Sequence, residues 1–193
     1  MKKNLITAVL MTVVTTILFG LVFPFVITGL AQLLFPAKAN GELIVRAGNV
    51  VGSRLIGQQF SSAGYFHSRP SSAGTGYDAA NSSGSNLGPT NHALFDRVQA
   101  DAATYHADNP NTPIPIDLLT TSGSGLDPHI SPAAAEFQVP RVARARGVSE
   151  AQLRQLIQQH TEGRQLGLLG EPRVNVLELN LALDDLTGKS KSQ

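Results

Sequence analysis

The chain has 193 residues, a formal net charge of +1, 18 glycines, and neither cysteine nor tryptophan. The lack of cysteine excludes disulfides and thiolate metal sites, and the balanced charge offers no basic face for a nucleic acid. About 150 residues follow the first apolar segment, enough for one domain with a hydrophobic core.

An uncharged apolar segment begins the chain. No charged residue lies between Lys3 and Lys38, and a bilayer is crossed by about 20 apolar residues. We expect one transmembrane helix over residues 5–34. Within it, Gly20, Pro24 and Gly29 predict a kink or the close approach of another helix.

A secretory signal peptide is the alternative interpretation of this segment. Signal peptides have an apolar core of about 7–15 residues, so the greater length here favours a retained anchor. Two lysines precede the span, while Lys38 and Arg46 follow it. The positive-inside rule then favours, by a small margin, a cytoplasmic N-terminus of residues 1–4 and an extracytoplasmic remainder.

The region after the span divides into a linker over residues 35–41, a domain over 42–188 and a tail over 189–193. The domain opens with two β-prone runs, 42–46 and 50–56, whose three-residue separation suits a hairpin.

A stretch rich in Gly, Ser, Asn and Pro covers residues 61–91. Such a composition is typical of a disordered loop. However, Tyr65, Phe66, Tyr77 and Leu87 are spaced through it, and long loops in compact domains are usually functional. We therefore expect an ordered loop.

Three helices can be predicted after this loop. Residues 91–106 repeat apolar side chains at helical spacing after a capping Asn91 or Thr90. Ser131 followed by Pro132 starts a helix that runs to about Gly147 and is bent or interrupted near Pro140. A capping box at Ser149 opens a further helix that ends near residue 160, followed by a loop over 163–172.

The last element, residues 175–186, is ambiguous. Its leucines alternate as in a strand, but Asn175 with Glu178 forms a helix cap and Gly188 a natural stop. We favour a helix. The predicted fold class is thus α+β: a single N-terminal transmembrane helix followed by one mixed α/β extracytoplasmic domain with long ordered loops.

Catalytic and metal-binding motifs do not emerge from the sequence. The glycines at 123 and 125 lack the lysine of a phosphate-binding loop, and the five histidines lack the HExxH spacing of a zinc site. We expect no catalytic residue, no metal site and no directly bound cofactor. An alternative is a membrane-anchored hydrolase in which Ser122 or Ser124 acts with Asp127 and His129, although no GxSxG context supports it.

Five phrases of the sequence together resemble the C subunit of the bacterial Kdp potassium-transporting ATPase, and the resemblance covers almost the whole chain. The phrases are GSRLIGQ at 52–58, YFHSRP at 65–70, GSNLGPTN at 84–91, TSGSGLDPHISP at 121–132 and PRVNVL at 172–177.

This resemblance implies an accessory subunit that spans the bacterial inner membrane once and places its domain in the periplasm. The implied partners are a channel-like subunit that binds potassium, a P-type ATPase subunit that uses ATP, a small single-span subunit and membrane lipid. ATP and potassium then belong to the complex. The family is also described as a catalytic chaperone that raises the pump subunit's affinity for ATP. A periplasmic domain cannot reach cytoplasmic nucleotide, so we expect indirect coupling through the helix; direct ATP binding is a further alternative without a supporting motif.

We expect the partner contacts to come from the span and from two loops. The candidate residues are Gly20, Pro24, Gly29, Arg69, Asn86, Asn91 and Asp127. The loops could also guide potassium, since Asp78, Asp117 and Asp127 offer hard oxygen ligands. Stabilisation of turns is the more common role of such aspartates.

Overall fold

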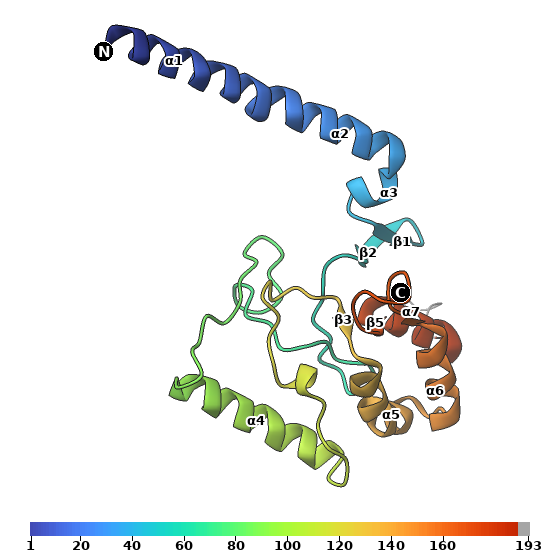
Figure 1. Cartoon of the computed structure of the whole chain (residues 1–193). Coiled ribbons are helices and arrows are strands. Elements are labelled where there is room, and N and C mark those ends of the chain that lie inside the picture. Colours follow the sequence, from blue (N-terminus) through green and yellow to red (C-terminus); the bar gives the residue numbers. More distant parts are fainter. Residues whose placement is uncertain (189–193) are drawn as a thin grey trace. The chain divides into compact units, whose positions relative to one another are not determined.

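The computed structural model describes residues 1–188 (Figure 1). The chain separates into two compact units, Met1–Val51 and a larger unit that begins at Gly52. Each unit is described by itself.

The first unit is dominated by one apolar helix, Lys2–Leu34, with a mean hydropathy of 2.5 and none of its side chains buried. It consists of α1 (Lys2–Ile17), a π-helical turn η1 (Leu18–Val22) and α2 (Phe23–Leu34). It is the one segment of the described residues that is long and apolar enough to cross a membrane. This agrees with the predicted transmembrane helix.

The π-helical turn ends at Val22, two residues before Pro24. Proline lacks a backbone N–H, and its ring would clash with the carbonyl four residues earlier, here that of Gly20. Widening the helix to π geometry at this point relieves the clash. Along the same helix, the hydroxyls of Thr7 and Thr12 donate to the carbonyls of Lys3 and Ala8, so these polar groups are satisfied without water.

A short helix α3 (Pro36–Ala39) and a hairpin of β1 (Leu43–Arg46) and β2 (Asn49–Ser53) follow. The hairpin was predicted, but its second strand was predicted to reach Ile56 and this was wrong. The strand ends at Ser53 because the Ser53 hydroxyl accepts a hydrogen bond from the Leu55 N–H at 3.0 Å, which closes a turn.

The second unit contains a small antiparallel sheet in the order β3-β5-β4. The strands are β3 (His129–Ile130), β4 (Thr161–Glu162) and β5 (Arg173–Asn175). In this register His129 lies opposite Asn175, and Thr161 lies opposite Val174. The sheet joins segments that lie on either side of two helices in the sequence.

The helices of the second unit are α4 (His92–Asp108), the 3-10 turn η2 (Ile116–Leu118), α5 (Pro132–Arg146), α6 (Glu150–Gln159) and α7 (Val176–Thr187). The predicted N-caps are confirmed: Asn91, Ser131, Ser149 and Asn175 each accept a backbone N–H with their side chains. The ambiguous last element is a helix. It ends at Gly188, which has a φ of 70°.

The prediction for α5 left a bend or an interruption near Pro140 open. The helix is not interrupted at Pro140 but continues to Arg146, and Gly147 ends it at a φ of 68°. The helix loses one N–H at Pro140, yet Val139 and Val142 on either side are fully buried. The packing of this face therefore outweighs the missing hydrogen bond.

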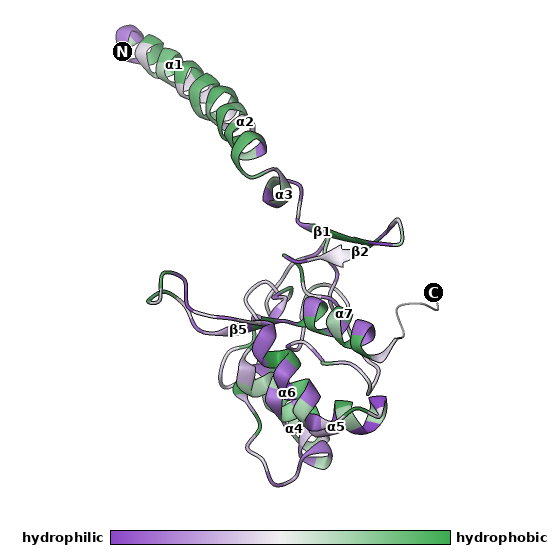
Figure 2. Cartoon of the chain, turned by 90° about the vertical axis from the view of Figure 1, so that its right-hand side faces the viewer, coloured by the Kyte–Doolittle hydropathy of each residue, from purple (hydrophilic) through white to green (hydrophobic). Residues whose placement is uncertain are grey.

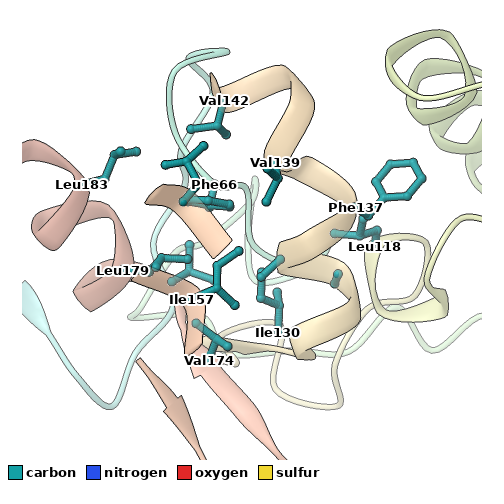
Figure 3. Close-up of a cluster of buried hydrophobic side chains, with 14 of the residues drawn as sticks. Phe66, Leu118, Ile130, Phe137, Val139, Val142, Ile157, Val174, Leu179 and Leu183 are labelled. Atoms are coloured by element: carbon teal, nitrogen blue, oxygen red, sulfur yellow. The ribbon is translucent and has the colours of Figure 1, made fainter. Parts of the chain in front are cut away.

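The core of the second unit surrounds Phe66 (Figure 3). Figure 3 shows Phe66 between α5, which carries Val139 and Val142, and α7, which carries Leu179 and Leu183. Phe66 belongs to the loop predicted to be ordered, so the loop contributes the centre of the core and is fixed by it. The predicted α+β class with long ordered loops is confirmed.

Candidate partner interface

Arg69 joins the long loop to the segment before β3. Its guanidinium donates to the Thr120 carbonyl at 3.3 Å, the Thr121 carbonyl at 3.4 Å and the Asp127 carboxylate at 3.3 Å. The Tyr77 hydroxyl donates in turn to the Arg69 carbonyl. Burial raises the pKa of Tyr77 to about 12, so this hydroxyl keeps its proton at neutral pH.

Asp127 ends the same segment and turns the chain into β3. One carboxylate oxygen accepts the His129 N–H at 3.0 Å, and the other accepts from Arg69. Burial opposes ionisation of this carboxyl, but the hydrogen bonds from His129 and the charge of Arg69 outweigh it, and the pKa of Asp127 is lowered. Asp127 is therefore an ionised partner of Arg69.

A second set of hydrogen bonds fixes the tip of the loop against residues 122–125. The Ser71 hydroxyl donates to the Gly125 carbonyl at 2.6 Å and accepts the Tyr77 N–H at 2.8 Å. The Ser83 N–H donates to the Ser124 carbonyl at 2.9 Å. The two loops that the sequence marked as candidate interfaces are thus one structure.

Two buried amide side chains hold the loop from the other side, and sequence reasoning missed both. Asn180 of α7 accepts the Phe66 N–H at 2.8 Å and donates to the Phe66 carbonyl at 2.9 Å. Gln138 of α5 does the same for His67, at 2.8 and 3.1 Å. These two amides form the hydrogen bonds to backbone N–H and C=O groups that a neighbouring β-strand would otherwise form. The available signal was a polar residue on each otherwise apolar helix face.

The three aspartates considered as potassium ligands are engaged within the protein. Asp117 accepts the Ser131 N–H at 2.7 Å, Asp78 accepts the Ala80 N–H at 2.9 Å, and Asp127 is bound as described. Within residues 1–188, no three His, Asp or Glu side chains gather as metal ligands would. These contacts support the turn-stabilising role.

The serines proposed for a hydrolase do not face a base. The Ser124 hydroxyl accepts the Leu126 N–H at 3.1 Å and lies 3.4 Å from the Ser122 hydroxyl. The hydrogen bonds found across the described residues include none from either serine to His129, which approaches Asp127 instead. This geometry gives the hydrolase alternative no support.

An open groove of about 510 Å³ lies beside the Arg69–Asp127 contact. Ile116, Asp117 and Arg173 also line it, and Ile116 is 70% exposed. The groove therefore combines an exposed aliphatic side chain with charges of both signs, a combination that suits a protein side chain better than a small nucleotide.

The other predicted contact residues are spread over both units. Asn86 is exposed in the long loop, and Asn91 caps α4 by accepting the Ala93 N–H at 2.9 Å. In the span, a Cβ at Gly29 would meet nothing within 4 Å, and one at Gly20 only Thr16. Of the seven candidates, the structure brings Arg69 and Asp127 together.

An apolar helix long enough to cross a membrane, joined to a domain with a core of its own, is the architecture of a membrane-anchored protein. The family described as "KdpC: K+-transporting ATPase, c chain" matches residues 5–185. Curated relatives carry the name "Potassium-transporting ATPase KdpC subunit". The one from Koribacter versatilis is 66% identical over 95% of both chains, and that from Acidobacterium capsulatum is 58% identical over 95% of this chain and 99% of its own length. A third, from Methylobacterium nodulans, is 54% identical over 98% of this chain and all of its own. The chain belongs to the KdpC family.

Proposed function

We propose that this chain is an accessory, non-catalytic subunit of an ATP-driven potassium uptake complex, needed for its assembly and stability. The observation that carries the proposal is a 33-residue apolar helix that buries none of its side chains within the chain. Such a helix is available for contact with lipid and with the helices of a channel-like subunit, a P-type ATPase subunit and a small single-span subunit.

In this proposal Gly20, Pro24 and Gly29 form helix contacts. Small residues let helix backbones approach closely in a membrane, and the space beside Gly20 and Gly29 is open. Gly20→Leu and Gly29→Leu should each reduce the amount of partner subunits that co-purify with the tagged chain. Ala8→Leu enlarges another exposed position of the same helix and should leave recovery unchanged. Equal recovery in all three variants would refute the contact.

The proposed location is the inner membrane, with residues 1–4 in the cytoplasm and the second unit in the periplasm. The balance of lysines and arginines around the span supports this orientation. Because the chain lacks cysteine, single cysteines at Asn4 and Asn111 can be labelled selectively. A membrane-impermeant maleimide added to cells with a permeabilised outer membrane should modify Asn111→Cys and spare Asn4→Cys. The reverse pattern would invert the topology.

The loops joined by Arg69 and Asp127 are proposed to cap the channel-like subunit, with exposed Asn86 and the Asn91 turn at their margin. Their mutual hydrogen bonds support a preformed surface, which loses little conformational freedom on binding. In this arrangement the joined loops would limit the path of potassium toward the channel-like subunit, and the channel-like subunit would bind the ion.

We also propose that the subunit raises the pump subunit's affinity for ATP through its helix. ATP and potassium act at the level of the complex, and the second unit, on the opposite side of the membrane, needs no nucleotide site. Coupling of this kind is reciprocal: ATP bound to the pump subunit should in turn strengthen its hold on this chain.

A further inference from the structure

The strands β4 and β5 are joined by a hairpin, residues 163–172, that carries an aliphatic tip (Figure 2, beside the label β5). Leu166, Leu168 and Leu169 are 90%, 81% and 60% exposed. Three neighbouring exposed leucines on one projection mark a surface that binds something apolar. The membrane-spanning helix does not account for them, since they belong to the other unit.

Four backbone N–H groups of the tip are already hydrogen-bonded within it. The N–H groups of Gly167, Leu168 and Leu169 donate to carbonyls of Arg164 and Gln165, and Gln165 and Leu169 form a β-bridge. A segment that enters an apolar phase must satisfy its polar backbone groups in this way, because hydrocarbon offers no partner for them.

The charges that flank the tip are also neutralised. One guanidinium nitrogen of Arg164, Nη2, donates to both carboxylate oxygens of Glu171, at 2.9 and 2.7 Å, and no charged residue lies between these two positions. The pair stands at the base of the tip, where a headgroup region would accommodate it.

The composition of the tip indicates whether it binds another protein or the hydrocarbon of a lipid bilayer. Energetically important contacts between proteins are enriched in Trp, Tyr and Arg and poor in Leu, whereas leucine is among the side chains most favourable in hydrocarbon. Moreover, only residues 35–51 separate the span from the second unit. Even fully extended, they would reach at most roughly 60 Å, so the second unit stays tethered to the bilayer surface.

We propose that the tip formed by Leu166, Leu168 and Leu169 inserts into the interface of the lipid bilayer and gives the second unit its own membrane contact. Insertion of the tip requires the anchoring helix but neither a particular orientation of the chain nor its partner subunits. It therefore stands or falls separately from the accessory role.

The absence of tryptophan allows a direct test. The full-length Leu168→Trp chain is reconstituted into phosphatidylcholine–phosphatidylglycerol vesicles with and without brominated acyl chains, which quench indole on contact. Most of its emission should be lost in the brominated vesicles. Full-length Phe95→Trp serves as the matched control, because Phe95 is 60% exposed on α4 of the same unit and its replacement should stay unquenched.

A third chain checks that leucine, and not the introduced indole, drives the insertion. Leu168→Trp combined with Leu166→Ser and Leu169→Ser should lose the quenching while its circular dichroism is unchanged. Unquenched emission from Leu168→Trp alone would overturn the proposal, as would equal quenching of Phe95→Trp. Protection of the Leu168→Trp indole only after partner subunits are added would assign the tip to a protein surface instead.

Discussion

At the scale of single residues, the amides of Asn180 and Gln138 hold the extended main chain at Phe66 and His67. Asn180→Ala would leave both the N–H and the carbonyl of Phe66 buried without a partner. Each such group costs about 1–3 kcal/mol, so we expect the free energy of unfolding to fall by roughly 3 kcal/mol. Urea titration followed by circular dichroism measures the change.

The matched control for this prediction is Gln155→Ala, which removes an amide from the exposed face of α6. It should change the free energy of unfolding by less than about 0.5 kcal/mol. Similar losses in the two variants would show that the Asn180 hydrogen bonds contribute nothing particular.

A second prediction concerns Asp127 and pH. Its pKa is lower in the folded chain than the ordinary 3.8, so its ionised form stabilises the fold. This contribution is complete above the ordinary value and is lost as the pH falls through the lowered folded value. Asp127→Asn should therefore be less stable than the natural chain at pH 7, by about 1 kcal/mol.

The same comparison at acid pH tests the sign. Below the folded pKa both chains carry a neutral side chain at this position, so the difference in their free energies of unfolding should shrink toward zero. Urea titrations at pH 7 and at a series of decreasing acid pH values follow this difference. A difference that stays constant or grows on acidification would contradict the ionised Arg69–Asp127 contact.

The residue-scale contacts that could be predicted are the local ones. The caps at Ser131, Ser149 and Asn175 bind a group three residues ahead, and such spacing is visible in a sequence. Asn180 and Gln138 bind partners 114 and 71 residues away. No local pattern identifies those partners.

At the scale of elements, the two glycine-rich loops fold as one because Gly125 of the second loop packs directly against the backbone of the first. Its φ is +68°, and a Cβ there would come within 2.5 Å of the Ser83 carbonyl and 2.7 Å of the Ala73 nitrogen. Gly125→Ala must therefore strain the backbone and separate the loops, and we expect a loss of about 3 kcal/mol. Thermal unfolding of the detergent-solubilised chain checks it.

Gly123→Ala supplies the control two residues away, because a Cβ at Gly123 would meet nothing within 4 Å. It should leave the melting temperature within a degree or two of the natural value, as surface changes usually do. If Gly125→Ala melts together with Gly123→Ala, then the close packing of the two loops is not a source of stability.

The length of each helix or strand determined whether it could be predicted from the sequence. The span and α4 to α7 have ten residues or more and repeat apolar side chains over several turns, and their existence was predicted correctly, whereas the four-residue α3 lies in the predicted linker and was missed. Strands β3 and β4 have two residues each, too few to show an alternation. They exist because β5 lies between them and pairs with both, which is a property of the tertiary fold.

At the scale of the whole molecule, the chain combines an anchor that buries nothing within itself with a unit that has its own core. Both the family resemblance and the span could be predicted from the sequence. Long specific motifs and a charge-free apolar segment can be recognised without any knowledge of the tertiary structure. The candidate interface could be predicted only as two loops. That Arg69 and Gly125 join them into one surface required the fold.

The measurement that tests the accessory role most directly is potassium-stimulated ATP hydrolysis by the purified complex, with and without this chain, over a range of ATP concentrations. The chain alone should hydrolyse no ATP. Its removal should lower the rate mainly at low ATP concentration and raise the KM for ATP, and its return should restore both. A complex that keeps its full rate and its KM without the chain would contradict the account.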